Sequence, residues 1–147
     1  MTDWRDAADA RSVVRALALV PHPEGGHYRE TWRDLPPSGA RGAGTAILFA
    51  LAGGEASRWH KVDAAELWVW QAGAPLLLQI EGVSDTRLGP NLVEGETLHG
   101  LVPADAWQSA ASLGNWTLCS CIVAPAFQFS GFEMRDESGA NSPNEES

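Results

Sequence analysis

The sequence predicts an all-β fold, an antiparallel sandwich or jelly-roll barrel that follows one short N-terminal helix. Short segments with strand-like apolar patterns succeed one another, and Gly and Pro residues separate them. A jelly roll is the natural way to close so many strands without long exposed edges. The chain of 147 residues has the size of one domain, which we expect to span residues 1–135.

The convincing helical pattern lies near the N-terminus. Val13, Val14 and Leu17 recur at the spacing of one helical face, and Pro21 closes the segment. This pattern predicts an amphipathic helix over about residues 6–18.

Strands are expected where apolar residues alternate with polar ones, or follow one another in short runs, instead of recurring at the helical spacing. The segments are GHYRETWR (26–33), TAILFAL (45–51), ELWVWQAG (66–73), PLLLQIEG (75–82), ETLHGLV (96–102), AWQSAA (106–111), WTLCSCIV (116–123) and FQFSGFEM (127–134). The Pro- and Gly-rich stretch 34–44 is the longest loop, and it forms either a lid or a surface excursion.

The composition excludes several classes of partner. The formal net charge is −9 and only ten residues are Lys or Arg, which argues against nucleic acid. The acidic N-terminus and the lack of a long apolar run argue against a signal peptide and a membrane span, so we expect a cytoplasmic protein. Residues 136–147 are polar and acidic, which predicts a disordered tail.

Two cysteines lie on one predicted strand. Alternation points Cys119 and Cys121 to the same face, too far apart along the strand for ordinary disulfide geometry. We interpret them as reduced core thiols, with redox chemistry as the alternative.

The segment 54–73 carries a polar pair among apolar residues. Its His60, Val62 and Glu66 have the spacing of the first motif of the cupin superfamily, which the segment resembles. A second histidine ordinarily stands at the position of Val62. Residues 97–112 resemble the second cupin motif, in which the usual histidine, glycine and asparagine are replaced here by Gln108, Asp105 and Ser112.

Three segments resemble one branch of that superfamily, cupin family five, a domain of unknown function. They are PHPEGGHYRETWR (21–33), HKVDAAELW (60–68) and VAPAFQFSGFEM (123–134). The resemblance covers residues 10–134. It implies a cupin jelly-roll barrel (a double-stranded β-helix), commonly a homodimer, similar in shape to the sugar-nucleotide epimerase of the rhamnose pathway.

The cupin positions supply few metal ligands. His60 and Glu66 are strong ligands, whereas a catalytic metal usually has three. Gln108 can complete a weak divalent-metal site with them, and His99 can approach in the fold. We expect no resident cofactor.

Without a metal, His60 and Glu66 form either an acid–base pair or a buried pair that only stabilises the barrel. In the first case Glu66 orients His60, and His60 acts as a general base. Tyr28, the only tyrosine, is the candidate acid, as the resemblance to the sugar epimerases implies.

The segment 27–33 supplies further candidates. Alternation places Arg29 and Arg33 on one face and Tyr28 on the other. Arg29 either binds a ligand carboxylate or phosphate or forms a salt bridge with an acid such as Glu24. His22 is expected to lie exposed on the preceding turn.

Two tryptophans follow Glu66 with the same strand parity. Trp68 and Trp70 form either a stacking wall for a ligand or part of the core. Trp59 and Trp107 are expected on the opposite side of their strands. Phe127, Phe129 and Phe132 are interpreted as packing residues.

These observations predict a barrel that binds a small polar ligand, such as a sugar nucleotide, and acts on it in the manner of an epimerase or isomerase. The predicted catalytic residues are His60, Glu66 and Tyr28, and the predicted ligand contacts are Arg29, Gln108, Trp68 and Trp70. The alternatives are a non-catalytic metabolite-binding barrel and a metal-dependent cupin enzyme such as an oxygenase.

Overall fold

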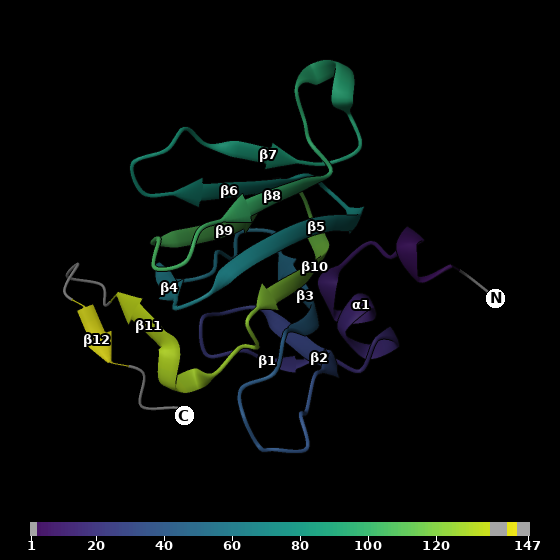
Figure 1. The fold of residues 1–147 in the computed structure, drawn as a ribbon. Helices are drawn as coiled ribbons and strands as arrows, with labels where there is room; N and C mark the ends of the chain where they lie inside the picture. Colours follow the sequence, from purple (N-terminus) through teal and green to yellow (C-terminus); the bar gives the residue numbers. More distant parts are fainter. Residues whose placement is uncertain (1–2, 136–140, 144–147) are drawn as a thin grey trace.

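A computed structural model describes residues 3–135 and 141–143, which form two six-stranded antiparallel sheets with little helix (Figure 1). The helical elements are η1 (Trp4–Asp6), α1 (Ala10–Ala16), η2 (Leu92–Glu94) and η3 (Phe129–Gly131). The strands are β1 (Val20–Pro21), β2 (His27–Arg33), β3 (Thr45–Ala52), β4 (His60–Val62), β5 (Ala65–Gly73), β6 (Leu76–Ile80), β7 (Thr86–Leu88), β8 (His99–Val102), β9 (Gln108–Ser112), β10 (Trp116–Ala124), β11 (Phe132–Arg135) and β12 (Asn141–Pro143).

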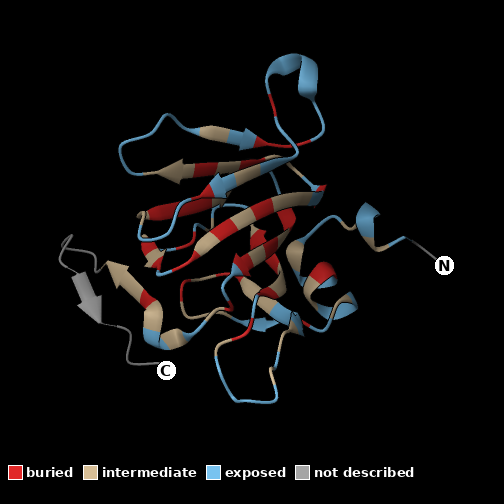
Figure 2. Ribbon diagram, viewed as in Figure 1, coloured by how far each residue is buried: buried red, intermediate tan, exposed pale blue. Residues whose placement is uncertain are grey.

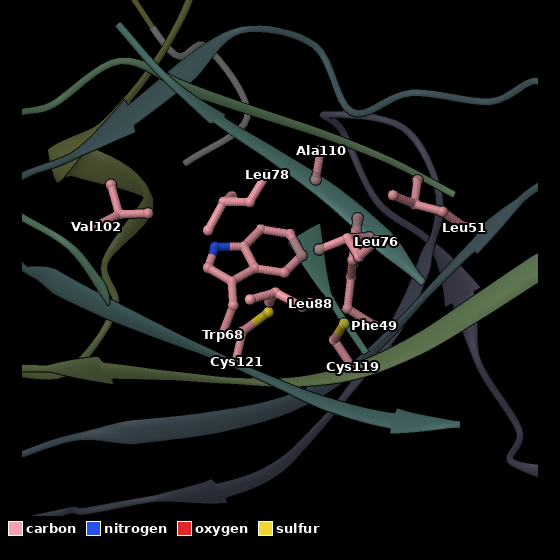
Figure 3. Packing of buried hydrophobic residues seen from close by; sticks show 10 residues of the cluster. All are labelled: Phe49, Leu51, Trp68, Leu76, Leu78, Leu88, Val102, Ala110, Cys119 and Cys121. Atoms are coloured by element: carbon pink, nitrogen blue, oxygen red, sulfur yellow. The ribbon is translucent and has the colours of Figure 1, made fainter. Parts of the chain in front are cut away.

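The core lies between the two sheets. One sheet has the strand order β1-β2-β3-β10-β5-β8, and the other has the order β12-β11-β4-β9-β6-β7. Trp68, at the centre of the largest apolar cluster, belongs to the first sheet and packs with Leu78 and Leu88 of the second (Figure 3). Buried residues accordingly recur along the central strands of both sheets (Figure 2). The predicted all-β fold is confirmed.

The N-terminal helix is shorter than predicted. Asp9 caps α1, because its Oδ1 accepts the N–H of Ser12 at 3.1 Å, and the preceding residues form the separate turn η1. The helix packs through Val13 against the outer face of the first sheet, in a cluster with Ala50 and Leu118. The amphipathic pattern thus identified the buried face, whereas the cap determined where the helix begins.

The chain crosses between the sheets just before Glu66. β4 belongs to the second sheet and β5 to the first, and only residues 63–64 join them. His60 and Glu66 therefore approach the interior from opposite sheets, and Gln108 is the partner of His60 in the register of β4 and β9.

The stretch 34–44 is held against the rest of the surface. Arg41 Nη2 lies 2.7 Å from Asp63 Oδ1, and its Nε donates to the carbonyl oxygen of Ala126 at 2.7 Å. These contacts favour a fixed surface excursion over a lid.

Of the predicted disordered tail, only Asn141–Pro143 lies within the described residues, where it pairs with β11 as β12. The rest of the tail prediction lies outside them. In the described part of the chain, no helix has the length and apolar character needed to span a bilayer.

Candidate active site

A cavity of about 50 Å³ lies beside the core, between the two sheets. Two buried histidines, His22 and His60, and two buried glutamates, Glu24 and Glu66, line it. Glu30 and Arg33 also line it and are partly exposed, so they mark its solvent side. The remaining lining residues are Tyr28, Thr45, Ile47, Val62, Cys121, Val123, Phe127, Phe129 and Phe132.

His60 reaches the cavity from β4 and carries a positive charge. Its Nδ1 lies 2.7 Å from the carbonyl oxygen of Arg58, and its Nε2 lies 2.7 Å from Glu24 Oε2. Burial lowers the pKa of His60, but the Glu24 carboxylate, with a smaller contribution from Glu66, raises it to about 9. His60 is therefore an imidazolium at neutral pH.

Glu24 is placed by a tight turn before β2. Gly25 and Gly26 adopt φ values of 103° and 77°, in the left-handed region that favours glycine. The N–H of His22 donates to the carbonyl oxygen of Gly26 at 2.9 Å, which closes the turn. Burial raises the pKa of Glu24, but His60 and His22 bring it below its ordinary value, so this carboxylate stays ionised.

The contact between Glu24 and His60 is an ion pair without hydrogen-bond geometry. The 2.7 Å separation makes the attraction between the opposite charges strong, although the carboxylate oxygen has no well-aligned donor. Glu24 Oε2 is therefore a buried acceptor that still has capacity for a ligand donor.

His22 was expected to be exposed, and this prediction is wrong, since its side chain is only 5% exposed. Its Nδ1 accepts the N–H of Glu24 at 3.1 Å, so the neutral ring carries its proton on Nε2. Burial lowers the pKa of His22, and the ring packs edge-on against Tyr28 with centroids 4.5 Å apart. Within the described residues, Nε2 has no hydrogen-bond partner, which leaves an N–H donor in the cavity wall.

Glu66 ends a chain of buried hydrogen bonds. Trp68 Nε1 donates to Gln108 Oε1 at 2.8 Å, and Gln108 Nε2 donates to Glu66 Oε1 at 2.9 Å. Burial raises the pKa of Glu66 to about 7, although His60 and the hydrogen bonds from Gln108 and Cys121 act in the opposite direction. The pKa of Glu66 thus lies well above the ordinary value of a glutamate.

The structure brings His60, Glu66 and Gln108 together but pairs them differently from the prediction. The carboxylate against His60 is Glu24, whereas Glu66 is held by Gln108. The pKa of His60 is raised to about 9 and that of Glu66 to about 7, so Glu66 is the one of the two whose pKa lies nearer neutral pH. Sequence reasoning missed His22 and Glu24, although the HPEGG segment that carries them was visible as a motif.

A bulge in β2 determines which of its residues face the cavity. The pairing of β2 with β3 shifts between Glu30 and Trp32, so that Arg33 joins Tyr28 and Glu30 in the cavity wall. Arg29 is exposed and does not line the cavity, so its predicted role as ligand contact is not supported. Its alternative partner Glu24 is bound to His60 instead.

The tryptophans after Glu66 are core residues. Trp68 is 1% exposed, and Figure 3 shows its indole packed among Leu78, Leu88 and Cys121. Trp70 packs against the same cluster and donates its Nε1–H to the carbonyl oxygen of Ala74 at 3.1 Å. Neither lines the cavity, so the structure favours the core alternative over a stacking wall.

The structure also places five further aromatic residues and His99 relative to the cavity. Trp59 and Trp107 lie under the guanidinium of Arg135, away from the cavity lining. Phe127, Phe129 and Phe132 pack on one another and line the cavity as well. His99 is exposed on the edge strand β8 and does not approach the site.

The side chains of the predicted weak metal site already form hydrogen bonds or ion pairs with other residues of the protein. The oxygen of Gln108 accepts the Trp68 N–H, and Glu66 Oε1 accepts from Gln108. Val62 offers no ligand atom, and the two ring nitrogens of His60 each lie 2.7 Å from another oxygen, Nδ1 from the Arg58 carbonyl and Nε2 from Glu24 Oε2. Among residues 3–135 and 141–143, no three His, Cys, Asp or Glu side chains are arranged to hold a metal ion. This donor set does not fit a metal centre with three protein ligands.

Comparisons with known proteins support the resemblance. A hypothetical protein from Leishmania major is 28% identical, with a TM-score of 0.80 over 89% of each chain. A protein from Shewanella oneidensis is 33% identical, with a TM-score of 0.79 over 87% of this chain and 85% of that one. The DMSP lyase DddQ from Ruegeria pomeroyi shows the same fold at 17% identity, with a TM-score of 0.56 over 80% of this chain and 64% of that one. No curated protein matches.

The family model described as "Cupin superfamily (DUF985)" matches residues 11–135, nearly the whole described domain. The two facing antiparallel sheets have the jelly-roll arrangement of that superfamily. The chain therefore belongs to this cupin family.

Proposed function

We propose that this cupin is an enzyme that moves a proton on a small polar organic molecule, as epimerases and isomerases do. The supporting observation is that Glu66, with a pKa of about 7, and His60, with a pKa of about 9, line the same buried cavity. A general base works best when its pKa lies near the ambient pH, and an acid of higher pKa keeps its proton until negative charge develops nearby.

The proposed reaction begins at Glu66. Its carboxylate accepts a proton from a carbon next to a carbonyl group, and the C–H electrons move toward the carbonyl oxygen. The Nε2–H of His22 donates a hydrogen bond to that oxygen, and the positive charge of His60 stabilises the negative charge that grows there. In a hydroxyketone, return of the proton from Glu66 to the former carbonyl carbon, while the proton of the adjacent hydroxyl moves to the enolate oxygen, gives an isomer. Return of a proton from Tyr28 to the opposite face of the original carbon gives an epimer.

The size of the cavity limits what enters it. A volume of about 50 Å³ accommodates roughly three to five water-sized groups. The reacting end of a ligand fits this space, and the nucleotide of a sugar nucleotide would have to remain outside. We therefore favour a small metabolite over the sugar nucleotide that resemblance to the epimerases suggested.

The test is exchange of solvent deuterium into candidate ligands. Short 2-oxo acids, hydroxyketones and sugar nucleotides are incubated with the protein in D₂O, and loss of the proton next to the carbonyl is followed by NMR. We expect exchange with at least one small compound and a loss of about a hundredfold or more in Glu66→Gln, since a general base contributes roughly that factor.

Glu94→Gln, which alters an exposed carboxylate, is the matched control and should exchange at the wild-type rate. Exchange that continues unchanged in Glu66→Gln would remove Glu66 from the mechanism. Binding without exchange by every compound would instead establish the non-catalytic metabolite-binding barrel.

The metal-dependent alternative has its own test. Protein purified without chelator is analysed for transition metals, and we expect less than stoichiometric metal because the donors contact one another. A stoichiometric metal that disappears in His60→Ala would overturn the proposed metal-free chemistry.

A further inference from the structure

We propose that Arg33 binds the carboxylate of the ligand, so that the substrate is a short organic acid. This inference rests on the proposed function, because it assumes that the reacting end of the same molecule reaches Glu66.

Arg33 is held rigidly at the solvent side of the cavity. Its Nε and Nη2 donate to Glu30 at 2.9 and 2.8 Å, and its Nη1 donates to the carbonyl oxygen of Phe127 at 2.9 Å. Its side chain is 32% exposed, so solvent and ligand both reach it. A guanidinium fixed in this way loses little further conformational freedom when it binds an anion.

Arg33 still has N–H groups that can donate hydrogen bonds to a ligand. Each terminal nitrogen keeps one N–H without a partner in the described part of the chain, whereas both oxygens of Glu30 already accept from Arg33. The complementary group on a ligand is therefore an acceptor, and a carboxylate matches the planar guanidinium best.

Thr45 adds a second donor beside Arg33. The two residues are direct partners in the pairing of β2 with β3. Thr45 is 1% exposed, and its Oγ1 accepts the N–H of Phe127 at 3.1 Å. The hydroxyl proton itself has no acceptor in the described residues and is free to bind a ligand oxygen.

A single row of paired residues connects this anion site to Glu66. Across the first sheet, Arg33 pairs with Thr45, Thr45 with Val123, and Val123 with Glu66, and all four line the cavity. The row crosses three strand spacings, from β2 to β5, so the backbones of Arg33 and Glu66 lie roughly 14 Å apart.

The side chains of Arg33 and Glu66 extend into that interval. The space that remains between them fits an acid of a few carbons lying over Thr45 and Val123. The opposite wall includes Phe129 and Phe132, which suits an apolar carbon chain between the carboxylate and the reacting carbon.

The test uses 2-oxobutyrate, its uncharged amide and inorganic phosphate as probes of the full chain, with binding followed through the backbone and indole N–H signals in NMR titrations. We expect the acid to bind and the amide to bind at least tenfold more weakly. Phosphate competing as well as the acid would identify a general anion site and overturn the assignment to a carboxylate.

Variants separate this role from the general effect of charge. Arg33→Gln should weaken 2-oxobutyrate at least tenfold, and Thr45→Val severalfold, while Arg29→Gln removes the same charge from the exposed face of β2 and should change nothing. Because Arg33 also fixes Glu30 and Phe127, Arg33→Lys provides a second variant that keeps the charge but loses the planar fork. We expect it to fold and to bind the acid more weakly.

The outcomes distinguish this inference from the proposed function. Unchanged acid binding in Arg33→Gln, or no binding of the acid at high millimolar concentration, overturns the inference. Proton exchange in an uncharged carbonyl compound that is insensitive to Arg33→Gln would leave the proposed function standing alone. Binding that depends on Arg33, without proton exchange in any compound, would support this inference and contradict the proposed function.

Discussion

Glu66 and His60 both have raised pKa values, for different reasons. For Glu66 the largest cause is burial, which penalises the carboxylate. For His60 burial acts in the opposite direction and the Glu24 carboxylate overcomes it. In both residues the folded protein binds the proton more tightly than the unfolded chain does. Each therefore contributes stability at low pH that is lost as the pH rises through its pKa.

The first prediction concerns Glu66→Gln. Wild-type protein should lose stability between about pH 4.5 and 7, where Glu66 ionises in the fold, and the variant lacks this loss. The melting temperature of the variant relative to wild type should therefore rise with pH, by several degrees between pH 5 and 8 for about 1–3 kcal/mol. Thermal denaturation at a series of pH values measures it. A difference that is constant across this range would show that Glu66 has an ordinary pKa.

The second prediction concerns Glu24→Gln. Without the carboxylate that overcomes burial, the pKa of His60 should fall from about 9 toward its ordinary value of 6.5. Titration of the imidazole signals by NMR measures the change, and Glu94→Gln, at an exposed position, should leave it unaltered. If His60 kept its high pKa in Glu24→Gln, Glu66 would have to be its dominant partner after all.

At the scale of residues, the sequence predicted which side chains meet in the site better than it predicted which of them are partners. His60, Glu66 and Gln108 follow from the cupin spacing, and all three meet in the fold. The partnership of His60 with Glu24 was not predictable, because a separation of 36 positions in the chain leaves no local pattern. It results from a turn whose backbone is tied to the segment before β4, where the N–H of Arg58 donates to the carbonyl oxygen of Glu24 at 2.7 Å.

At the scale of elements, the HPEGG turn and the bulge in β2 determine the site. The bulge reverses the faces of the last residues of β2, so that simple alternation selected Arg29 where the structure places Arg33 at the cavity. A bulge inserts one residue into the pairing without a strict composition, so a single sequence does not reveal it. The glycines of the turn were recognisable, but not the inward direction of the residues before them.

The third prediction concerns that turn. A Cβ on Gly26 would lie 2.8 Å from the carbonyl oxygen of Ala50 and 2.9 Å from Phe49 Cζ, at a φ of +77°. We expect Gly26→Ala to lower the free energy of unfolding by about 2–4 kcal/mol, from backbone strain and overpacking together.

Gly39→Ala is the matched control, since Gly39 has a φ of +79° and nothing within 4 Å of an added Cβ. It should lose only about 1 kcal/mol. Chemical denaturation measures both variants, and equal losses would mean that the neighbours of Gly26 give way.

At the scale of the whole molecule, the fold was predictable because its signals are local. Turn residues and the short apolar period recur along the chain, and the jelly roll follows from closing many antiparallel strands. The homodimer and the cytoplasmic location remain predictions, which light scattering and cell fractionation would test.

The fourth prediction concerns the formal net charge of −9. A chain of this charge repels an anionic ligand at long range, so the association rate of 2-oxobutyrate should rise severalfold between about 10 and 150 mM salt as the repulsion is screened. Line-shape analysis in NMR titrations measures the rate, and the uncharged amide should show no such dependence. A rate that falls with salt would indicate a locally positive entrance that dominates the overall charge.

The hydrogen-bond chain from Trp68 through Gln108 to Glu66 connects an indole N–H to the carboxyl group that titrates. When Glu66 gains or loses its proton, the amide between them repolarises, and the strength of the indole N–H bond changes with it. We expect the indole N–H resonance of Trp68 to shift when Glu66 gains or loses its proton. A ligand that changes the protonation of Glu66 should shift the same resonance in the unmodified protein.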